Sequence, residues 1–224
     1  MNIFSTNFKK PYVIIRYFQQ SSWQYVFDNM NYFTNSRNQN TIDEIWFVEH
    51  DPVYTQGQVF QKKNKKFIHD IPVIYANRGG KITYHGPGQQ IVYLLLDLKR
   101  LKMNIRQLLF LIEYVVLNTL FSFTIIGNNF KTGIYVEHKK ICSIGLRIKK
   151  YYSLHGFALN VNMDLTPFKY INPCGDAKII MTQMYTVKNN ISVNIVQKTL
   201  IKKFSLFFDV ISISTVNNIN PIKI

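Results

Sequence analysis

Several features that would restrict the biology of this protein are scarce in its 224 residues. Only two cysteines are present, too few for a disulfide framework, so a reducing compartment is expected. No apolar run approaches the ~18 residues of a membrane span, since Glu113 and Asn118 interrupt residues 108–121. Arg16 interrupts the apolar N-terminal run and no small-residue cleavage site follows, which argues against a signal peptide. These absences predict a cytoplasmic protein without membrane contact.

Acidic residues are also scarce. The chain has 12 Asp and Glu against 27 Lys and Arg, a formal net charge of +15. The basic residues cluster at Lys62, Lys63, Lys65 and Lys66, at Arg147, Lys149 and Lys150, and at Lys198, Lys202 and Lys203. Such charge suits an acidic protein partner or nucleic acid, but no nucleic-acid-binding motif accompanies it. The alternative is a solvated surface in a chain rich in Asn, Ile and Lys.

The apolar pattern predicts a mixture of helices and strands. Strands are expected at residues 13–18, 44–49, 73–76, 91–96 and 154–161, with a hairpin of residues 134–136 and 141–148 turning at Glu137 and His138. Helices are expected after Ser21 or Ser22, after Asn104, and around Val196, Leu200, Ile201, Phe204 and Phe208. We predict one α+β domain over residues 1–224, a central mixed β-sheet flanked by helices. Residues 190–224 carry no motif and are expected to form a C-terminal helix and tail.

A glycine-rich polar segment occupies residues 78–89, with the sequence R-G-G-K-I-T-Y-H-G-P-G-Q. Glycine lacks the Cβ that would block a close approach, so this backbone can wrap around a ligand. A tight surface turn would have a similar composition. Within the segment, His85 could position a substrate or form a dyad with a cysteine.

The segment I-N-P-C-G places Cys174 in a predicted turn. A thiolate is a strong nucleophile and a good leaving group, so it suits taking an acyl group from one thioester and passing it to an amine. The alternative is a structural cysteine, for which Cys142 in its apolar strand is the better candidate. Lys140 could favour the thiolate by its charge and exchange protons, although most lysines, such as adjacent Lys139, lie on the surface. The histidines have no metal-ligand spacing with either cysteine.

These segments, together with four others, resemble a known family. The matching motifs are D-E-I-W-F-V-E-H, T-Q-G-Q, R-G-G-K-I-T-Y-H-G-P-G-Q, K-K-I-C-S-I-G-L-R-I, H-G-F-A-L-N-V-N-M-D-L and I-N-P-C-G, in the family's order over roughly residues 11–185. The chain resembles the octanoyl-[acyl-carrier-protein]:protein N-octanoyltransferases, the lipoate-protein ligase B family. Thr132 stands where this family usually has proline, and residues 61–66 are more basic than usual.

The resemblance implies the fold of the biotin and lipoate protein ligases and a cofactor-free acyl transfer. Octanoyl-acyl carrier protein would acylate Cys174, and a lysine on the lipoyl domains of 2-oxoacid dehydrogenase complexes or on glycine cleavage H protein would accept the group. Lys140 would lower the pKa of the Cys174 thiol and relay protons. Substrate contacts are implied for Arg78, Gly79, Gly80, Lys81, Ile82, Thr83, Tyr84, His85, Ser143, Ile144, Gly145, Gly156, Phe157 and Ala158. His155 would orient the pocket.

Two other functions remain open from the sequence. An ATP-dependent lipoate or biotin ligase shares the fold, but forms an adenylate and needs no nucleophilic cysteine. A basic RNA-binding module would bind with strong salt dependence and would not need Cys174.

Overall fold

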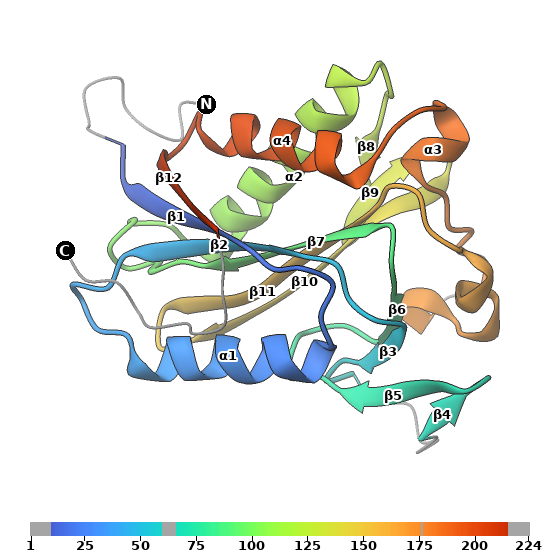
Figure 1. Cartoon of the computed structure of the whole chain (residues 1–224), viewed down its shortest axis with the longest axis horizontal. Helices are drawn as coiled ribbons and strands as arrows, with labels where there is room; N and C mark the ends of the chain where they lie inside the picture. Colours follow the sequence, from blue (N-terminus) through green and yellow to red (C-terminus); the bar gives the residue numbers. More distant parts are fainter. Residues whose placement is uncertain (1–9, 60–65, 176, 215–224) are drawn as a thin grey trace.

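The protein, as a computed structural model, is described for residues 10–59, 66–175 and 177–214. Its main feature is an eight-stranded sheet of order β12-β1-β2-β7-β11-β10-β9-β8 (Figure 1). The strands are β12 (Asp209–Ser214), β1 (Tyr12–Tyr17), β2 (Asp43–Val48), β7 (Gln89–Leu95), β11 (Tyr152–Asn160), β10 (Lys139–Lys149), β9 (Gly133–Val136) and β8 (Asn128–Asn129). Strand β1 runs parallel to β2 and β12, and the other neighbours are antiparallel. The predicted α+β class with a central mixed sheet is confirmed.

Helices cover both faces of this sheet. Helix α1 (Trp23–Ser36) lies on one face, and α2 (Ile105–Ser122) and α4 (Val193–Phe204) lie on the other (Figure 1). The Ser22 hydroxyl accepts a hydrogen bond from the Tyr25 amide at 3.3 Å, and Asn104 forms a capping box with Gln107. Both helix starts are therefore as the sequence predicted. A short helix, α3 (Met184–Val187), precedes α4.

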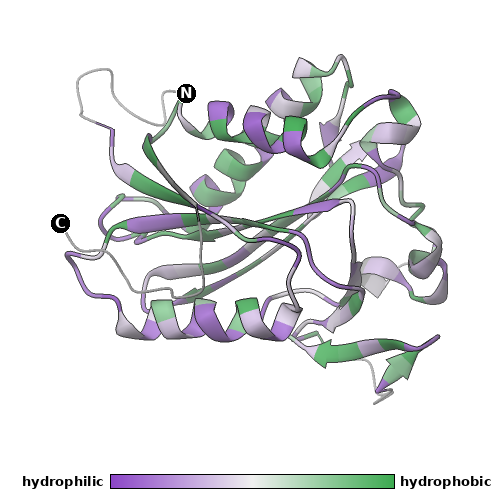
Figure 2. Ribbon diagram, viewed as in Figure 1, coloured by the Kyte–Doolittle hydropathy of each residue, from purple (hydrophilic) through white to green (hydrophobic). Residues whose placement is uncertain are grey.

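The two largest apolar layers of the core are separated by the main sheet. In β2, Ile45 and Phe47 belong to the larger layer beneath α2 and α4, whereas Trp46 and Val48 belong to the layer beneath α1, because successive side chains of a strand alternate in direction. Figure 2 shows apolar residues along the central strands and on the inward side of α2. Helix α2 is long and apolar enough to cross a membrane, but it buries one face in this core, as a core helix does.

A smaller four-stranded sheet, of order β4-β5-β3-β6, lies beside one end of the main sheet (Figure 1). It contains β4 (Phe67–Ile68), β5 (Ile71–Tyr75), β3 (Val53–Gln56) and β6 (Ile82–His85). Strand β6 lies inside the glycine-rich segment that the sequence marked as a ligand-wrapping backbone. It pairs antiparallel with β3, with Thr55 opposite Thr83.

Local signals located the hairpin correctly, but not the C-terminal strand. Strands β9 and β10 turn at Glu137 and His138, whose φ angles are 48° and 64°, as a tight hairpin turn requires. The sequence predicts a tail after the last helix, yet residues 209–214 form β12 on the edge of the sheet. Its partner, β1, is near the other end of the chain, so no local sequence pattern predicts the pairing.

Candidate functional site

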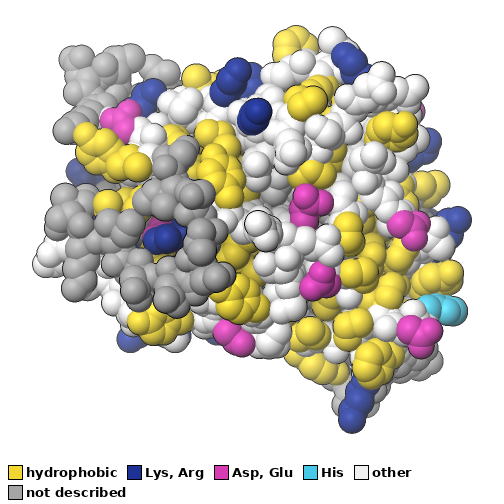
Figure 3. All heavy atoms as spheres, in the orientation of Figure 1, with side chains coloured by type: hydrophobic (Ala, Val, Ile, Leu, Met, Phe, Trp, Pro, Cys, Tyr) yellow, Lys and Arg dark blue, Asp and Glu magenta, His cyan; other side chains and the backbone are white. Residues whose placement is uncertain are grey.

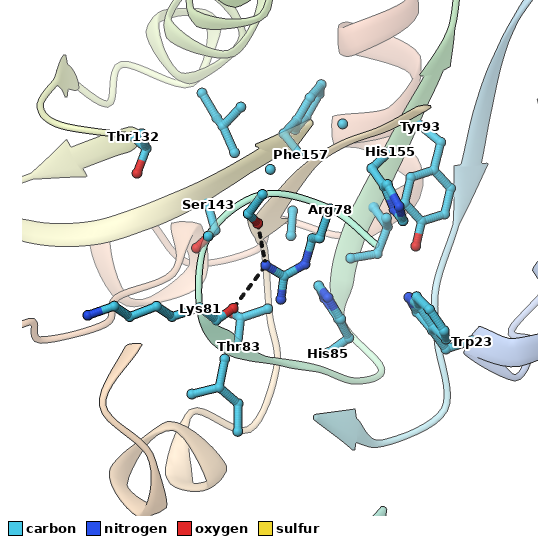
Figure 4. A pocket seen from close by; sticks show the side chains of 18 of the residues that line it. Trp23, Arg78, Lys81, Thr83, His85, Tyr93, Thr132, Ser143, His155 and Phe157 are labelled. Atoms are coloured by element: carbon cyan, nitrogen blue, oxygen red, sulfur yellow. Dashed lines mark hydrogen bonds between the residues drawn. The ribbon is translucent and has the colours of Figure 1, made fainter. Parts of the chain in front are cut away.

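A pocket of about 210 Å³ lies between the loop of residues 78–81, strand β6 and the middle of β10 and β11. Its lining includes every residue for which the family resemblance implies a substrate contact except Tyr84. It also includes residues absent from that set, namely Trp23, Val59, Ile91, Tyr93, Thr132 and His155. Figure 4 shows Arg78, His85, His155, Tyr93 and Trp23 arranged around the same space. Segments far apart in sequence therefore meet at one cavity.

Tyr84 does not line this pocket because side chains alternate along β6. Its ring packs on the opposite side of the strand, 5.5 Å from the centroids of Tyr54 and Phe168. Burial, and to a smaller extent the charge of Asp164, raise the pKa of Tyr84. The structure thus places Tyr84 in a small core, whereas its neighbours Thr83 and His85 face the pocket.

A pair of glycines forms part of the pocket wall. Gly145 of β10 and Gly156 of β11 are opposite each other in the antiparallel ladder. A Cβ on Gly145 would come within 3.1 Å of Arg78 Cδ. Ile144, Phe157 and Ala158 supply apolar surface around the pair. This wall suits the alkyl chain of an acyl group better than a charged ligand.

Arg78 holds the glycine loop in place. Its Nη1 donates to the carbonyls of Gly79 and Lys81, both at 2.9 Å, and its Nη2 donates to the Thr55 carbonyl at 2.7 Å and hydroxyl at 2.8 Å. These bonds use four of the guanidinium's five N–H groups. The Arg78 side chain therefore holds the loop of residues 78–81 against strand β3.

His85, which lines the pocket, continues this network of hydrogen bonds. Its Nε2 lies 3.2 Å from the Thr55 hydroxyl, and its Nδ1 lies 2.8 Å from Gln89 Oε1. Gln89 Oε1 can only accept, so His85 Nδ1 carries the proton and Nε2 accepts from Thr55. Burial, with smaller contributions from His50, Arg78 and other neighbours, lowers the pKa of His85 to about 3. His85 is therefore neutral with both nitrogens bonded, which disfavours the Cys–His dyad.

The network extends to the strand that carries Lys140. Gln89 Nε2 donates to Asn160 Oδ1 at 2.8 Å, and Asn160 Nδ2 donates to the Thr182 carbonyl at 2.9 Å. The Thr182 amide donates to the Lys140 carbonyl at 2.9 Å, and the Lys140 amide donates to the Ile180 carbonyl at 2.8 Å. A continuous chain of hydrogen bonds thus joins Arg78 to the backbone of Lys140.

Two further buried histidines lie close to the pocket. His50 Nε2 accepts from the Tyr93 hydroxyl at 2.8 Å while its Nδ1 donates to the Ser21 carbonyl at 3.0 Å. His155 Nε2 lies 2.6 Å from Asn77 Oδ1. Burial is the main cause that lowers the pKa of His50 to about 4 and that of His155 to about 3. Both are neutral, so they shape the pocket without adding charge.

Lys140 is 1% exposed, unlike its neighbour Lys139. Its ammonium lies 5.7 Å from the Tyr135 ring centroid, and a Cβ on Gly133 would meet its side chain, with Nζ at 3.0 Å. Gly133 follows Thr132, a pocket residue, so Lys140 lies next to the pocket wall. Cys142 is fully buried in the larger core layer, and burial raises the pKa of its thiol to about 12, so it is a structural cysteine as predicted.

Cys174 is described through its backbone, as the middle residue of the 3₁₀ turn η2 (Pro173–Gly175). This turn follows a second one, η1 (Thr166–Tyr170), and contacts β6. The backbone pairing of Lys140 with residues 180–182 brings the segment after Cys174 onto the start of β10. Met181, seven positions after Cys174, therefore lies beside Lys140.

Other predicted features fall outside this site. Of the first basic cluster, Lys62, Lys63 and Lys65 are not among the described residues. On the face drawn in Figure 3, acidic side chains are interspersed among the lysines and arginines. Within residues 10–59, 66–175 and 177–214, no three His, Cys, Asp or Glu side chains are grouped to hold a metal ion.

Comparison with known proteins gives consistent matches. Residues 23–205 match the family model of the lipoyl protein ligase A/B catalytic domain. The chain is 52% identical over 209 residues to an octanoyltransferase of Buchnera aphidicola subsp. Acyrthosiphon pisum, covering 92% of this chain and 99% of that protein. It is 51% identical over 174 residues to an octanoyltransferase of Klebsiella pneumoniae, covering 77% and 81%.

Solved structures share the fold at low identity. A lipoate-protein ligase A bound with ATP aligns with a TM-score of 0.74 at 16% identity, over 93% of this chain and 90% of that one. A biotin protein ligase from Aquifex aeolicus, in complex with biotin and ATP, aligns with a TM-score of 0.55 at 14% identity, over 86% and 68%. These likenesses confirm the expected fold.

Proposed function

Because this chain belongs to the lipoyl protein ligase A/B catalytic domain family, we propose a specific course for the reaction that it catalyses. The curated relatives, at 45–52% identity over most of the chain, are octanoyltransferases, and the protein is an enzyme that transfers octanoyl groups in protein lipoylation. The proposal concerns the donor, the covalent intermediate and the residues that act. It is supported chiefly by the Cys174 turn, which contacts strand β6 of an acyl-sized pocket, and by Lys140, which lies next to the wall of that pocket.

In the first half-reaction, the thiolate of Cys174 attacks the thioester carbonyl of octanoyl-acyl carrier protein. A new C–S bond to Cys174 forms, the C–S bond to the carrier breaks, and the carrier thiol leaves with a proton. Lys140 stabilises the attacking thiolate and supplies that proton. The apolar wall of Ile144, Phe157 and Ala158 holds the alkyl chain.

In the second half-reaction, the ε-amine of an acceptor lysine attacks the acyl-enzyme. The amide C–N bond forms, the C–S bond to Cys174 breaks, and the amine loses a proton that Lys140 takes up. The acceptors are lipoyl domains of 2-oxoacid dehydrogenase complexes and glycine cleavage H protein. The reaction is redox-neutral, and we place it in the cytoplasm, without a metal, nucleotide, nucleic acid or membrane.

The charge of the protein fits an acidic carrier. The excess of 27 basic over 12 acidic residues attracts an acidic domain at long range, and Arg147 lies beside the pocket, with its guanidinium bonded to the Asn77 carbonyl at 3.0 Å. This attraction would raise the rate of encounter more than the affinity.

The deciding experiment is intact mass spectrometry after incubation with octanoyl-acyl carrier protein. We expect an octanoyl adduct on the wild type and on Cys142→Ala, and no adduct on Cys174→Ala, with transfer reduced by ~10³-fold or more as for other lost nucleophiles. An adduct that persists in Cys174→Ala would refute the intermediate. Transfer that instead requires ATP and free octanoate would identify a ligase of the same fold.

A further inference from the structure

Lys81 is a second lysine close to the turn that carries Cys174. It ends the loop of residues 78–81 and precedes β6, and its side chain is partly buried in the pocket wall. In Figure 4 the Lys81 side chain extends away from Arg78. Its carbonyl accepts from Arg78 Nη1 at 2.9 Å and from the Gly57 amide at 3.3 Å, so the point where the side chain leaves the loop is held firmly.

The end of this side chain lies against Gly175. A Cβ on Gly175 would overlap the Cδ and Nζ atoms of Lys81 and come within 2.7 Å of Cε. Gly175 also has a φ of 72°, in the left-handed region that favours glycine. Because Gly175 has no side chain, the methylene chain and ammonium of Lys81 fit against it.

The ammonium of Lys81 has no protein anion beside it in the part of the chain that the structure describes, from which residues 60–65 and 176 are missing. There it makes no side-chain hydrogen bond and no ion pair. A partly buried cation gains most when an anion forms next to it, because the surrounding protein screens charge less than water does. The anion that the proposed chemistry creates at this turn is the Cys174 thiolate.

We propose that Lys81 supplies a second positive charge at the Cys174 turn and stabilises the thiolate together with Lys140. This inference rests on the proposed role of Cys174 as nucleophile. The two lysines come from different elements: Lys140 is buried on β10 beneath Gly133 and Tyr135, whereas Lys81 lies over η2 from the pocket side. Lys140 also donates and accepts protons, whereas Lys81 contributes only its positive charge.

The test is the pH dependence of iodoacetamide labelling at Cys174, followed by peptide mass in the full-length protein. Lys81→Met should raise the apparent pKa of the thiol by about one unit, so labelling below that pKa slows about tenfold. Lys81→Arg should restore most of the wild-type profile because it keeps the charge. Lys99→Met, which removes an exposed lysine outside the pocket, should leave the profile unchanged.

Two results would overturn the inference while leaving the proposed function standing. One is a Lys81→Met profile that superimposes on the wild type while the octanoyl adduct still forms on Cys174. The other is an upward shift that Lys81→Arg does not reverse, since charge would then not be the cause. Absence of any adduct on wild-type Cys174 would refute the proposed acyl-enzyme intermediate itself. Thermal denaturation of each variant would identify a fold defect.

Discussion

Lys140 has a buried side chain whose surroundings differ from those of its exposed neighbour Lys139. A cation near the thiol favours the thiolate, so Lys140→Ala should raise the pH at which Cys174 is alkylated. It should also slow both half-reactions by ~10² to 10⁴-fold, the usual cost of losing a general acid–base group. The measurement is the pH profile of Cys174 labelling combined with single-turnover acylation and transfer.

Controls at the same position separate charge from proton transfer. Lys140→Arg should retain part of the thiol effect but not the proton relay, because a guanidinium does not deprotonate in proteins. Lys139→Ala should behave as the wild type. If the Lys140→Ala profile coincides with that of the wild type, Lys140 does not tune the thiol.

His85 is expected to position the loop and not to act as a base. Both ring nitrogens are bonded and its pKa is about 3, so the ring does not change charge near neutral pH. His85→Gln should cost about fivefold in kcat/KM, the equivalent of one lost buried hydrogen bond of ~1 kcal/mol. The shape of the pH–rate profile should not change.

A general base behaves differently in the same assay. Its removal would cost ~10² to 10⁴-fold and would abolish one limb of the pH profile. That outcome with His85→Gln would restore the Cys–His dyad. Thr55→Val, which removes the hydroxyl between Arg78 and His85, should reproduce the modest loss of the His85 variant.

At the scale of elements, the pocket depends on the glycine pair across β10 and β11. A Cβ on Gly145 would meet Arg78 Cδ, the middle of a flexible side chain, at 3.1 Å. A Cβ on Gly156 would instead overlap the Val92 carbonyl oxygen in the neighbouring strand β7 and come within 2.9 Å of Leu94 Cδ1. The same substitution should therefore have different effects at the two positions.

We expect Gly145→Ala to fold and to raise the KM for octanoyl donors more than for shorter acyl donors, because the added methyl group reduces the pocket volume. Gly156→Ala should lose about 1–3 kcal/mol of unfolding free energy, the usual cost of overpacking. Acyl-chain-length profiles and urea denaturation of the two variants provide the measurements. Equal stability losses at both positions would mean that the wall cannot adjust at Gly145.

Strand boundaries illustrate how the elements depend on one another. Strand β6 lies inside the glycine-rich segment of residues 78–89, for which the sequence predicts no strand. It forms a strand because its backbone pairs with that of β3 in an antiparallel ladder, with Tyr54 opposite Tyr84. This ladder also determines that Thr83 and His85 face the pocket and that Tyr84 does not.

For the whole molecule, three buried neutral histidines make stability depend on pH. His50, His85 and His155 have pKa values lowered to about 4, 3 and 3, while an unfolded histidine titrates near ~6.5. Between these values the unfolded state binds more protons than the folded state. Their contribution to stability is therefore complete above pH ~6.5 and is lost as the pH falls toward 3.

The expected slope is up to ~1.4 kcal/mol per pH unit for each histidine, or about 4 kcal/mol per pH unit for the three. Urea denaturation at pH 7, 6 and 5 would measure it. The exposed turn residue His138, replaced by Asn, which tolerates a positive φ, serves as the control and should not alter the slope. A free energy of unfolding that is flat from pH 7 to 5 would show that these histidines titrate in the folded state as they do in the unfolded state.

The sequence by itself determined the features that depend on neighbouring residues. The Ser22 and Asn104 helix caps and the turn at Glu137 and His138 follow from local hydrogen bonding and backbone preference. The motifs around residues 78–89 also marked the lining of one cavity, since all of the implied contact residues there except Tyr84 line it. Cys174 and Lys140 were recognised through motifs, and their chemistry remains a prediction.

Tertiary structure alone decided the features that depend on partners distant in sequence. Strand β12 exists because β1 pairs with it, and the hydrogen bonds from Arg78 through His85 to Lys140 join five separate segments, those of Thr55, residues 78–89, Lys140, Asn160 and Thr182. The contact of Lys81 with Gly175 requires the loop and the cysteine turn to fold together. Composition and spacing describe what a segment can do, whereas burial and pairing, which set pKa and side-chain direction, arise only when distant segments pack.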